Sequence, residues 1–427
     1  MKEIKLKGLN EIIYEHTTKE GLKVYMWVND KIKSAYMALS VRYGSIDTKF
    51  KINNTTYEVP NGIAHFLEHI KFNVDDSTTA HDLFYKIGSD ANAFTTFKYT
   101  SYMVFTTDKK DECLNTLLDF VYNPYFTTKM INKEKGIIIE EANMGDDDPY
   151  SLIFYKSLQN TFKNSKYRNK ITGTKEDIKN IDIKDIKLVY NTFYHPKNMF
   201  LTIMGNINPY EMALIVDKNL SKKEFNEYQN PIVIKDNEPN RVVKEYDEVL
   251  CNVTYPNIKY NIKIPLNKFK GIHPLLLKAG INLILNINLG STSEFKDELL
   301  TKGLIDSMYY STNIFDDYVL ISLNIVTKYV KEVINRVEDK LQNLEINEKD
   351  MRRKKNAALA GLILGFEDIE IVSNHLESDL IEYGDIIDNQ KELLENQSIK
   401  DIENILNKID YNNVSINVFM PNNNQDN

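Results

Sequence analysis

Residues 62–73 read GIAHFLEHIKFN and place two histidines, His65 and His69, four positions apart, with Glu68 directly before the second. Histidine is scarce in this chain, with seven among 427 residues, so two histidines in one short segment are a candidate functional pair. At about 100° per residue, a helix puts the apolar side chains of this stretch in one arc and the two histidines and Glu68 in the opposite arc. The apolar arc comprises Ile63, Phe66, Leu67 and Ile70.

The polar arc of this helix carries two histidines and a glutamate, residue types that zinc sites use. Asn61 is the expected N-cap of the helix. Imidazoles at positions i and i+4 lie on adjacent turns, close enough for both to bind one zinc ion at about 2.0–2.1 Å. Glu68 would then face a water molecule, which is the place of a general base. The alternative is a solvated helix face with a Glu–His pair. Two histidines do not complete a zinc site, so the hypothesis requires a third protein ligand.

Candidates for that ligand lie in residues 133–150, which read KEKGIIIEEANMGDDDPY. Glu134 and Glu141 are seven positions apart, which is two helical turns, and therefore share one face of a helix. The alternative for this acidic stretch is a solvated helix end. With the His-x-x-Glu-His order, the pattern resembles the pitrilysin/insulinase family of zinc metallopeptidases, whose motif order is termed inverzincin.

The resemblance assigns roles to these residues. In that family the third ligand is a glutamate about 70–80 residues after the second histidine, and a supporting glutamate lies seven positions before it. Here Glu141 follows His69 by 72 positions, and Glu134 is seven earlier. The resemblance therefore implies that Zn²⁺ is bound by His65, His69 and Glu141, with Glu134 in the supporting role. Glu140 is the nearest alternative ligand.

The same resemblance implies the reaction. Zn²⁺ acidifies a water molecule and polarises a peptide carbonyl, while Glu68 takes the proton from the water and returns it to the leaving amine. Residues 88–104, GSDANAFTTFKYTSYMV, resemble the family segment whose edge strand receives the substrate backbone. Strand addition binds an extended peptide through main-chain hydrogen bonds. The implied contact residues are Asn92, Ala93, Phe94 and Thr95; the alternative is an ordinary strand after a Gly-Ser-Asp turn.

The order of apolar runs predicts an α+β protein with two tandem domains. We expect a zinc-binding domain at 1–215, a polar, proline-punctuated linker at 216–250 and a structurally similar domain without the motif at 251–427. Each domain is expected to be an α/β sandwich, with a mixed or antiparallel sheet and helices on one face. We also expect helical structure across 348–380. The resemblance implies half of a clam-shell; the alternative is two unrelated α/β domains.

Composition excludes several classes of partner. The net charge is −8 and no basic stripe with interleaved aromatics occurs, so we expect no nucleic-acid partner. The N-terminus lacks the apolar core of a signal peptide, and the apolar stretch 274–290 is broken by Lys278, so no membrane association is expected. Cys113 and Cys251 suit reduced thiols, although the sequence leaves a disulfide open. These features favour a cytoplasmic location.

One departure from the family pattern suggests a partner subunit. Many active relatives carry an arginine and a tyrosine in the C-terminal domain, which bind substrate and stabilise its oxyanion. The comparable positions here are Leu300 and Asp306, and no arginine occurs between Arg241 and Arg336. The chain resembles the zinc-bearing subunit of half-length bacterial two-subunit members. We therefore expect a heterodimer with a non-identical family subunit that lacks the metal motif and supplies the arginine and the tyrosine.

The prediction from sequence is thus a zinc metalloendopeptidase that cleaves or processes peptides in an enclosed chamber, with peptide maturation or leader processing among its candidate roles. Two alternatives remain. The first is a catalytically silent family member acting as a binding or assembly subunit. The second is an unrelated α+β protein in which the histidine pair carries no chemistry.

Overall fold

The computed structural model describes residues 1–422, which form two compact units. Each unit is assembled from three stretches of the chain, because the chain passes between the units more than once. One of these passages lies at residue 235, inside the segment 216–250, and the others lie outside that segment. Unit 1 comprises Met1–Asn143, Asn169–Lys235 and Ile363–Gln390, and unit 2 comprises Met144–Arg168, Asp236–Leu362 and the described chain from Lys391 onward.

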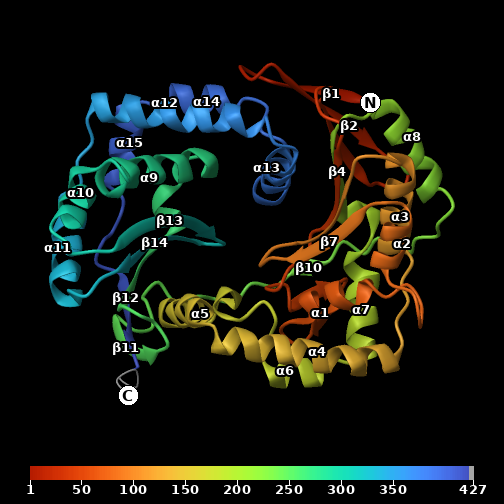
Figure 1. Ribbon diagram of the computed structural model, residues 1–427, viewed down its shortest axis with the longest axis horizontal. Helices are drawn as coiled ribbons and strands as arrows, with labels where there is room; N and C mark the ends of the chain where they lie inside the picture. The colour runs from red at the N-terminus through yellow and green to blue at the C-terminus, as the bar shows by residue number, and fades with distance from the viewer. Residues whose placement is uncertain (423–427) are drawn as a thin grey trace. The chain divides into compact units, whose positions relative to one another are not determined.

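Unit 1 is built on a seven-stranded mixed sheet in the order β1-β2-β3-β9-β4-β8-β7. Figure 1 labels β1, β2, β4 and β7 of this sheet. A smaller sheet, β10-β5-β6, lies in the same unit. β4 and β9 are buried along their whole length, and β7 is an edge strand paired with β8. The strands are β1 (Lys2–Leu6), β2 (Glu11–Thr17), β3 (Lys23–Val28), β4 (Ala35–Val41), β5 (Lys49–Ile52), β6 (Thr55–Glu58), β7 (Asp90–Thr95), β8 (Thr100–Thr106), β9 (Met199–Gly205) and β10 (Ile232–Val233).

The helices of unit 1 cover both faces of the central strands. α1, α3 and α8 contribute side chains to the main hydrophobic core, whereas α13 packs on β9 and β4. α4 begins in unit 1 and ends in unit 2. The helices are α1 (Ile63–Lys71), α2 (Ala80–Lys86), α3 (Lys110–Tyr122), α4 (Thr128–Asp147), α6 (Lys175–Asn180), α7 (Ile183–Phe193), α8 (Pro209–Leu220) and α13 (Ile369–Glu382), with a 3₁₀ turn, η2, at Pro196–Asn198.

Unit 2 repeats the central topology of unit 1. Its five-stranded sheet has the order β11-β15-β12-β14-β13, with the first pair parallel and the others antiparallel. The run β3-β9-β4-β8-β7 in unit 1 has the same sequence of pairings. This repetition confirms the predicted α+β class with two similar α/β domains. The expectation of helices on one face of each sheet was wrong for unit 1, because α13 packs on β9 and β4 from the face opposite the main core. The strands are β11 (Tyr246–Cys251), β12 (Asn257–Pro265), β13 (Ser307–Phe315), β14 (Tyr318–Val326) and β15 (Val414–Pro421).

The helices of unit 2 include the counterpart of the helix with the histidine pair. α9 lies between β12 and β13 in the chain and packs against β13, as α1 lies between β4 and β7 and packs against β7. α12 starts in unit 2 and ends in unit 1. The elements are α5 (Pro149–Thr161), η1 (Lys166–Arg168), η3 (Leu266–Phe269), α9 (Pro274–Leu289), α10 (Glu294–Thr301), α11 (Val330–Gln342), α12 (Glu348–Gly365), α14 (Gln390–Asn396) and α15 (Ile399–Leu406).

The structure adds detail to three expectations from sequence. The helical stretch 348–380 is two helices, because α12 ends at Gly365 and α13 starts anew, capped by the side chain of Asp368. β10 and all but the last residue of β11 lie within the segment expected to be a linker. The two cysteines are both free and buried, so the disulfide that the sequence left open is absent.

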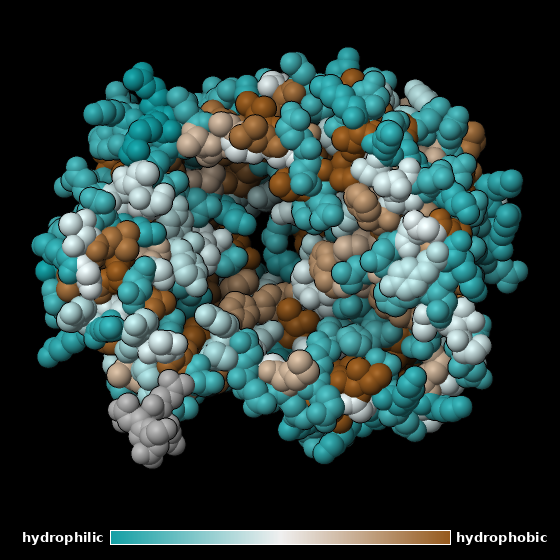
Figure 2. All heavy atoms as spheres, viewed as in Figure 1, coloured by the Kyte–Doolittle hydropathy of each residue, from teal (hydrophilic) through white to brown (hydrophobic). Residues whose placement is uncertain are grey.

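The apolar stretch 274–290 is the buried helix α9, whose Leu277, Ile281 and Ile284 lie in the core of unit 2. Hydrophilic side chains predominate on the face in view in Figure 2, and hydrophobic ones gather in smaller separate patches. Within residues 1–422, no helix combines the length and the apolar character needed to cross a bilayer.

A buried carboxyl group joins α13 to the central sheet. Glu377 is fully buried, and its carboxyl oxygens accept hydrogen bonds from Ser373 at 3.1 Å and from Ser40 at 3.2 Å. Burial disfavours the charged form and raises the pKa of Glu377 to about 7, against the opposing effect of the serine hydroxyls. The contact between α13 and β4 therefore depends on a group that titrates near neutral pH.

We expect Glu377→Gln to remove a pH dependence of stability. An unfolded glutamate ionises near pH 4.3, so the wild type loses about 3 kcal/mol of unfolding free energy as the pH rises from there to about 7. The variant lacks this loss, because glutamine does not titrate. Urea unfolding at about pH 5 and about pH 8 measures the difference, with Glu370→Gln, an exposed position on the same helix, as the control. Parallel pH profiles of wild type and Glu377→Gln would contradict this account.

Candidate metal centre

The helix α1 starts directly after Gly62, where another part of the backbone approaches too closely for a side chain. Gly62 has a φ of 81°, and a Cβ there would lie 2.3 Å from the carbonyl oxygen of Thr172. The side chain of Asn61 does not cap the helix, so that expectation was wrong. It donates to Asp177 at 3.2 Å and accepts from Asn169 at 3.1 Å. Asn61 therefore ties the start of α1 to the later segment that holds Gly62 in place.

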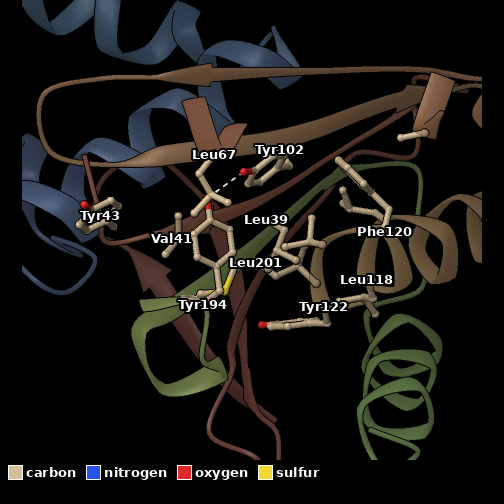
Figure 3. Packing of buried hydrophobic residues seen from close by; sticks show 14 of the residues in the cluster. Leu39, Val41, Tyr43, Leu67, Tyr102, Leu118, Phe120, Tyr122, Tyr194 and Leu201 are labelled. Carbon is tan, nitrogen blue, oxygen red and sulfur yellow. Dashed lines mark hydrogen bonds between the residues drawn. The ribbon is translucent and has the colours of Figure 1, made fainter. Parts of the chain in front are cut away.

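The apolar arc of α1 faces the core of unit 1. Figure 3 shows Leu67 beside Tyr102 and Tyr194, whose hydroxyl groups lie 2.8 Å apart. The opposite arc is not a solvated face. His65 is 9% exposed and Glu68 is 8% exposed, so the surface alternative for these residues is contradicted. Burying such polar groups is costly unless they are paired, and their partners are therefore informative.

α4 brings the two predicted glutamates to the histidine pair. Nε2 of His65 lies 3.4 Å from Oε1 of Glu141, and Nε2 of His69 lies 3.4 Å from Oε2 of the same carboxylate. One ligand atom from each of these three residues lies within 4.8 Å of the other two. Glu134, two turns earlier on α4, faces the other ring nitrogen of His69, with Oε1 at 3.1 Å from Nδ1.

The contact with Glu134 selects the ring nitrogen that His69 leaves free. A carboxylate accepts hydrogen bonds, so Nδ1 of His69 carries the proton and its Nε2 is left with a lone pair. Carboxylates that hold metal-binding histidines in this way fix the ring orientation and the tautomer. Nδ1 of His65 is buried and has no hydrogen-bond partner within residues 1–422. Of the two histidines, only His69 therefore has a carboxylate that orients its ring through Nδ1.

The donor set fits a zinc ion. Two imidazole nitrogens and one carboxylate are the ligands of many catalytic zinc sites, and tetrahedral bonds of about 2.0–2.1 Å put ligand atoms about 3.3 Å apart. Each imidazole Nε2 lies 3.4 Å from a different oxygen of the Glu141 carboxylate, which is close to that spacing. The carboxylates of Glu68, Glu134 and Glu141 all lie near the imidazole of His69, and Glu141 also contacts His65, so the site attracts a dication.

The charges at the site shift the pKa values of its members. Burial lowers the pKa of His69, but the hydrogen bond to Glu134 and the nearby carboxylates together raise it above its ordinary value. The contact with His65 and the charges of both histidines hold the pKa of Glu141 below its ordinary value, against the effect of partial burial. An ionised Glu141 is the form that binds a metal.

The alternative ligand, Glu140, lies elsewhere. Its side chain is exposed, and its carboxylate is within 3.4 Å of the amide of Asn143 on the same helix. It does not belong to the group formed by His65, His69 and Glu141. Neighbouring residues on a helix point about 100° apart, so only one of the two adjacent glutamates can face α1.

We expect Glu134→Ala to weaken zinc binding by about 10–100-fold, because His69 loses the group that orients its ring. Titration of the metal-free chain with zinc in the presence of a competing chelator measures this change. The matched control is Glu140→Ala on the exposed face of α4, which should bind zinc as the wild type does. Equal affinities for both variants would contradict the assigned role of Glu134.

The predicted substrate strand is β7. It has no strand partner on the side away from β8 within the described sheet, and it packs against α1 and α2. Asn92 is exposed, and Ala93, Phe94 and Thr95 are half-buried. The hydroxyl of Thr95 donates to Oε2 of Glu68 at 2.6 Å, so the strand and the metal-site helix meet at a hydrogen bond.

Sequence reasoning missed a buried lysine at the end of α1, the helix that carries the histidine pair. Lys71 is 1% exposed and donates to the carbonyl oxygen of Asn123 at 3.2 Å. Its ammonium group lies 5.4–5.9 Å from the ring centres of Phe120, Phe126 and Tyr190, which is cation–π range. The only signal in the sequence was a lysine directly after the apolar arc, and it did not distinguish burial from exposure.

The two positions at which the family resemblance leads us to expect an arginine and a tyrosine lie in unit 2. Leu300 is on α10 and 42% exposed, and Asp306 is exposed directly before β13. Arg336, the next arginine along the chain, is held on α11 by Glu332 and Glu298 at 3.0–3.1 Å.

Two family models match this chain, one in each part of it. Residues 24–175 match the family described as insulinase (peptidase family M16), and residues 180–358 match the peptidase M16 inactive domain. The chain is 36% identical over 312 residues to the uncharacterized zinc protease YmfH of Bacillus subtilis, a match that covers 72% of each protein.

Solved structures share the fold. The crystal structure of an M16-like peptidase from Alicyclobacillus acidocaldarius has a TM-score of 0.90 at 24% identity, covering 96% of this chain and 99% of that one. The periplasmic protease PqqL of Escherichia coli has a TM-score of 0.74 at 15% identity, covering 97% of this chain but 48% of that one. At these identities the likeness concerns the fold alone.

Proposed function

Because the chain belongs to the insulinase family of peptidases, family M16, we propose that it is a zinc-dependent endopeptidase. His65, His69 and Glu141 hold the metal in this proposal. The observation that carries it is the approach of both Nε2 atoms to one carboxylate, each at 3.4 Å, from a helix about 70 residues further along the chain. A coincidental histidine pair has no need of such a third group.

The chemistry divides between the metal and the side chains around it. Bound zinc supplies Lewis acidity, which acidifies water and polarises a carbonyl oxygen. Glu68 takes a proton from the attacking water and returns it to the leaving amine. Glu134 holds the ring of His69 in place through Nδ1.

The substrate class that fits β7 is an extended peptide. An edge strand offers unpaired main-chain groups, so a peptide can add to it as a further strand with little demand on its own sequence. Asn92, Ala93, Phe94 and Thr95 form this binding edge in our proposal. It would place the bound backbone beside α1, against which β7 packs. Precursor or leader peptides are substrates of this kind.

We also propose a non-identical subunit of the same family as partner. The match covers about half of the protease PqqL. In our proposal a separate subunit takes the place of the other half of such a protein. Leu300 and Asp306 stand where the family arginine and tyrosine are expected, and the partner would supply these two groups. A cytoplasmic location fits the two free thiols.

A silent assembly subunit is less well supported. The family description with the words "inactive domain" matches residues 180–358, which contain none of the proposed metal ligands. The experiment that tests the proposed function is Glu68→Gln in the chain together with its partner, with cleavage of an unstructured peptide as the readout. Abolished cleavage with zinc retained supports the peptidase.

A further inference from the structure

Thr95 ends the edge strand β7 and contacts the proposed general base. Its hydroxyl donates to Oε2 of Glu68 at 2.6 Å, which is a short, charge-assisted distance. Glu68 is 8% exposed, so water competes little for this oxygen. The hydrogen bond therefore joins two elements that do different jobs in the proposed function: α1, which carries the base, and β7, which receives the peptide.

The direction of this hydrogen bond follows from the neighbouring groups. Thr100 is the cross-strand partner of Thr95, and the two hydroxyl oxygens lie 3.4 Å apart. The proton of Thr100 is directed to the backbone carbonyl of Tyr43 at 3.0 Å, because a carbonyl only accepts. The hydroxyl proton of Thr95 therefore has two possible acceptors, Thr100 at 3.4 Å and Glu68 at 2.6 Å. The shorter contact, to an acceptor-only carboxylate, takes its proton.

This contact makes the two oxygens of Glu68 unequal. Oε2 accepts the hydrogen bond from Thr95, which restrains rotation of the carboxylate and leaves Oε1 as the oxygen with no hydrogen-bond partner among the described residues. A general base must hold its acceptor atom within hydrogen-bond reach of the proton that it takes. Small losses of alignment at such a group lower the rate without weakening substrate binding.

We propose that Thr95 is a positioning residue for Glu68, which links the seating of a peptide on β7 to the alignment of the base. The proposal rests on the peptidase function proposed above. Thr95 exchanges no proton with the substrate; its hydroxyl keeps its own proton throughout. The main-chain groups of β7 bind the peptide, and the side chain of its last residue holds Glu68, so the effect falls on kcat and not on KM.

The test compares Thr95→Val, which keeps the shape and removes the hydroxyl, with Thr95→Ser, which keeps the hydroxyl. Cleavage of an unstructured peptide is measured with the chain and its partner, together with zinc content. A hydrogen bond to a charged group corresponds to a fall in kcat of about 10–100-fold in Thr95→Val. We expect KM and zinc content to stay unchanged and Thr95→Ser to restore most of the rate.

A second measurement separates positioning from structural damage. In the Glu68→Gln background, adding Thr95→Val should cause no further loss of the residual rate and no change in peptide affinity, because residues acting as a unit are not additive. An unchanged kcat in Thr95→Val, or an equal further loss in the double variant, overturns the inference while the peptidase stands. Absence of cleavage by the wild-type pair overturns the proposed function itself.

Discussion

Replacement of Glu68 by glutamine is expected to lower kcat for peptide cleavage by about 10²–10⁴-fold, the usual contribution of a general acid–base group. Glutamine has nearly the same shape and can still accept the hydrogen bond that Thr95 donates to position 68. It cannot take a proton from water. The change therefore removes the proposed chemistry and leaves the packing of α1 on the core intact.

The variant must retain its metal for this result to be informative. The proposed ligands, His65, His69 and Glu141, are untouched, so zinc content should equal that of the wild type. Glu140→Gln is the matched control, because it removes one carboxylate from the exposed face of α4 and should keep full activity. Unimpaired cleavage by Glu68→Gln would contradict the assigned base, and unimpaired biological function with cleavage lost would favour an assembly role.

Addition of the partner subunit is expected to raise the cleavage rate of this chain by about 10²–10³-fold, the effect of one group that stabilises an oxyanion. The reason is our proposal that Leu300 and Asp306 of unit 2 stand where the family resemblance leads us to expect the arginine and the tyrosine. Arg336 does not replace the missing arginine, since two glutamates on α10 and α11 already hold it. The isolated chain would then bind peptide and zinc but turn over slowly.

Tagged purification from the native cell, with identification of the copurifying chains, provides the partner for this measurement. The informative control is a partner variant in which its arginine is replaced by lysine, which should form the pair but lose most of the stimulation. Full activity of the purified chain alone, with no effect of any copurifying subunit, would contradict the two-subunit account.

Local patterns in the sequence were sufficient for part of this structure. The arcs of α1 follow from the helical period, and the burial of Ile63 and Ile70 confirms the inner one. The spacing between Glu134 and Glu141 placed both on one face of α4 for the same reason. These features depend on neighbours within two turns, and periodicity reports such neighbours directly.

Features that depend on distant contacts were not predictable in this way. The start of α1 at Gly62 is imposed by the backbone of Thr172, more than 100 residues later. α13 packs on β4 of unit 1, where its buried Glu377 accepts a hydrogen bond from Ser40. The periodicity of α13 alone does not predict that contact. The hydrogen bond between Thr95 and Glu68 joins a strand and a helix whose approach is a property of the whole fold.

The zinc content of the gently purified wild-type chain tests the central claim most directly. Elemental analysis should give about one zinc ion per chain, and a double variant, His65→Ala with His69→Ala, should contain almost none, because one carboxylate does not hold zinc tightly on its own. Wild-type chain without stoichiometric zinc, or equal zinc in both proteins, would contradict the claim that these residues form a metal site.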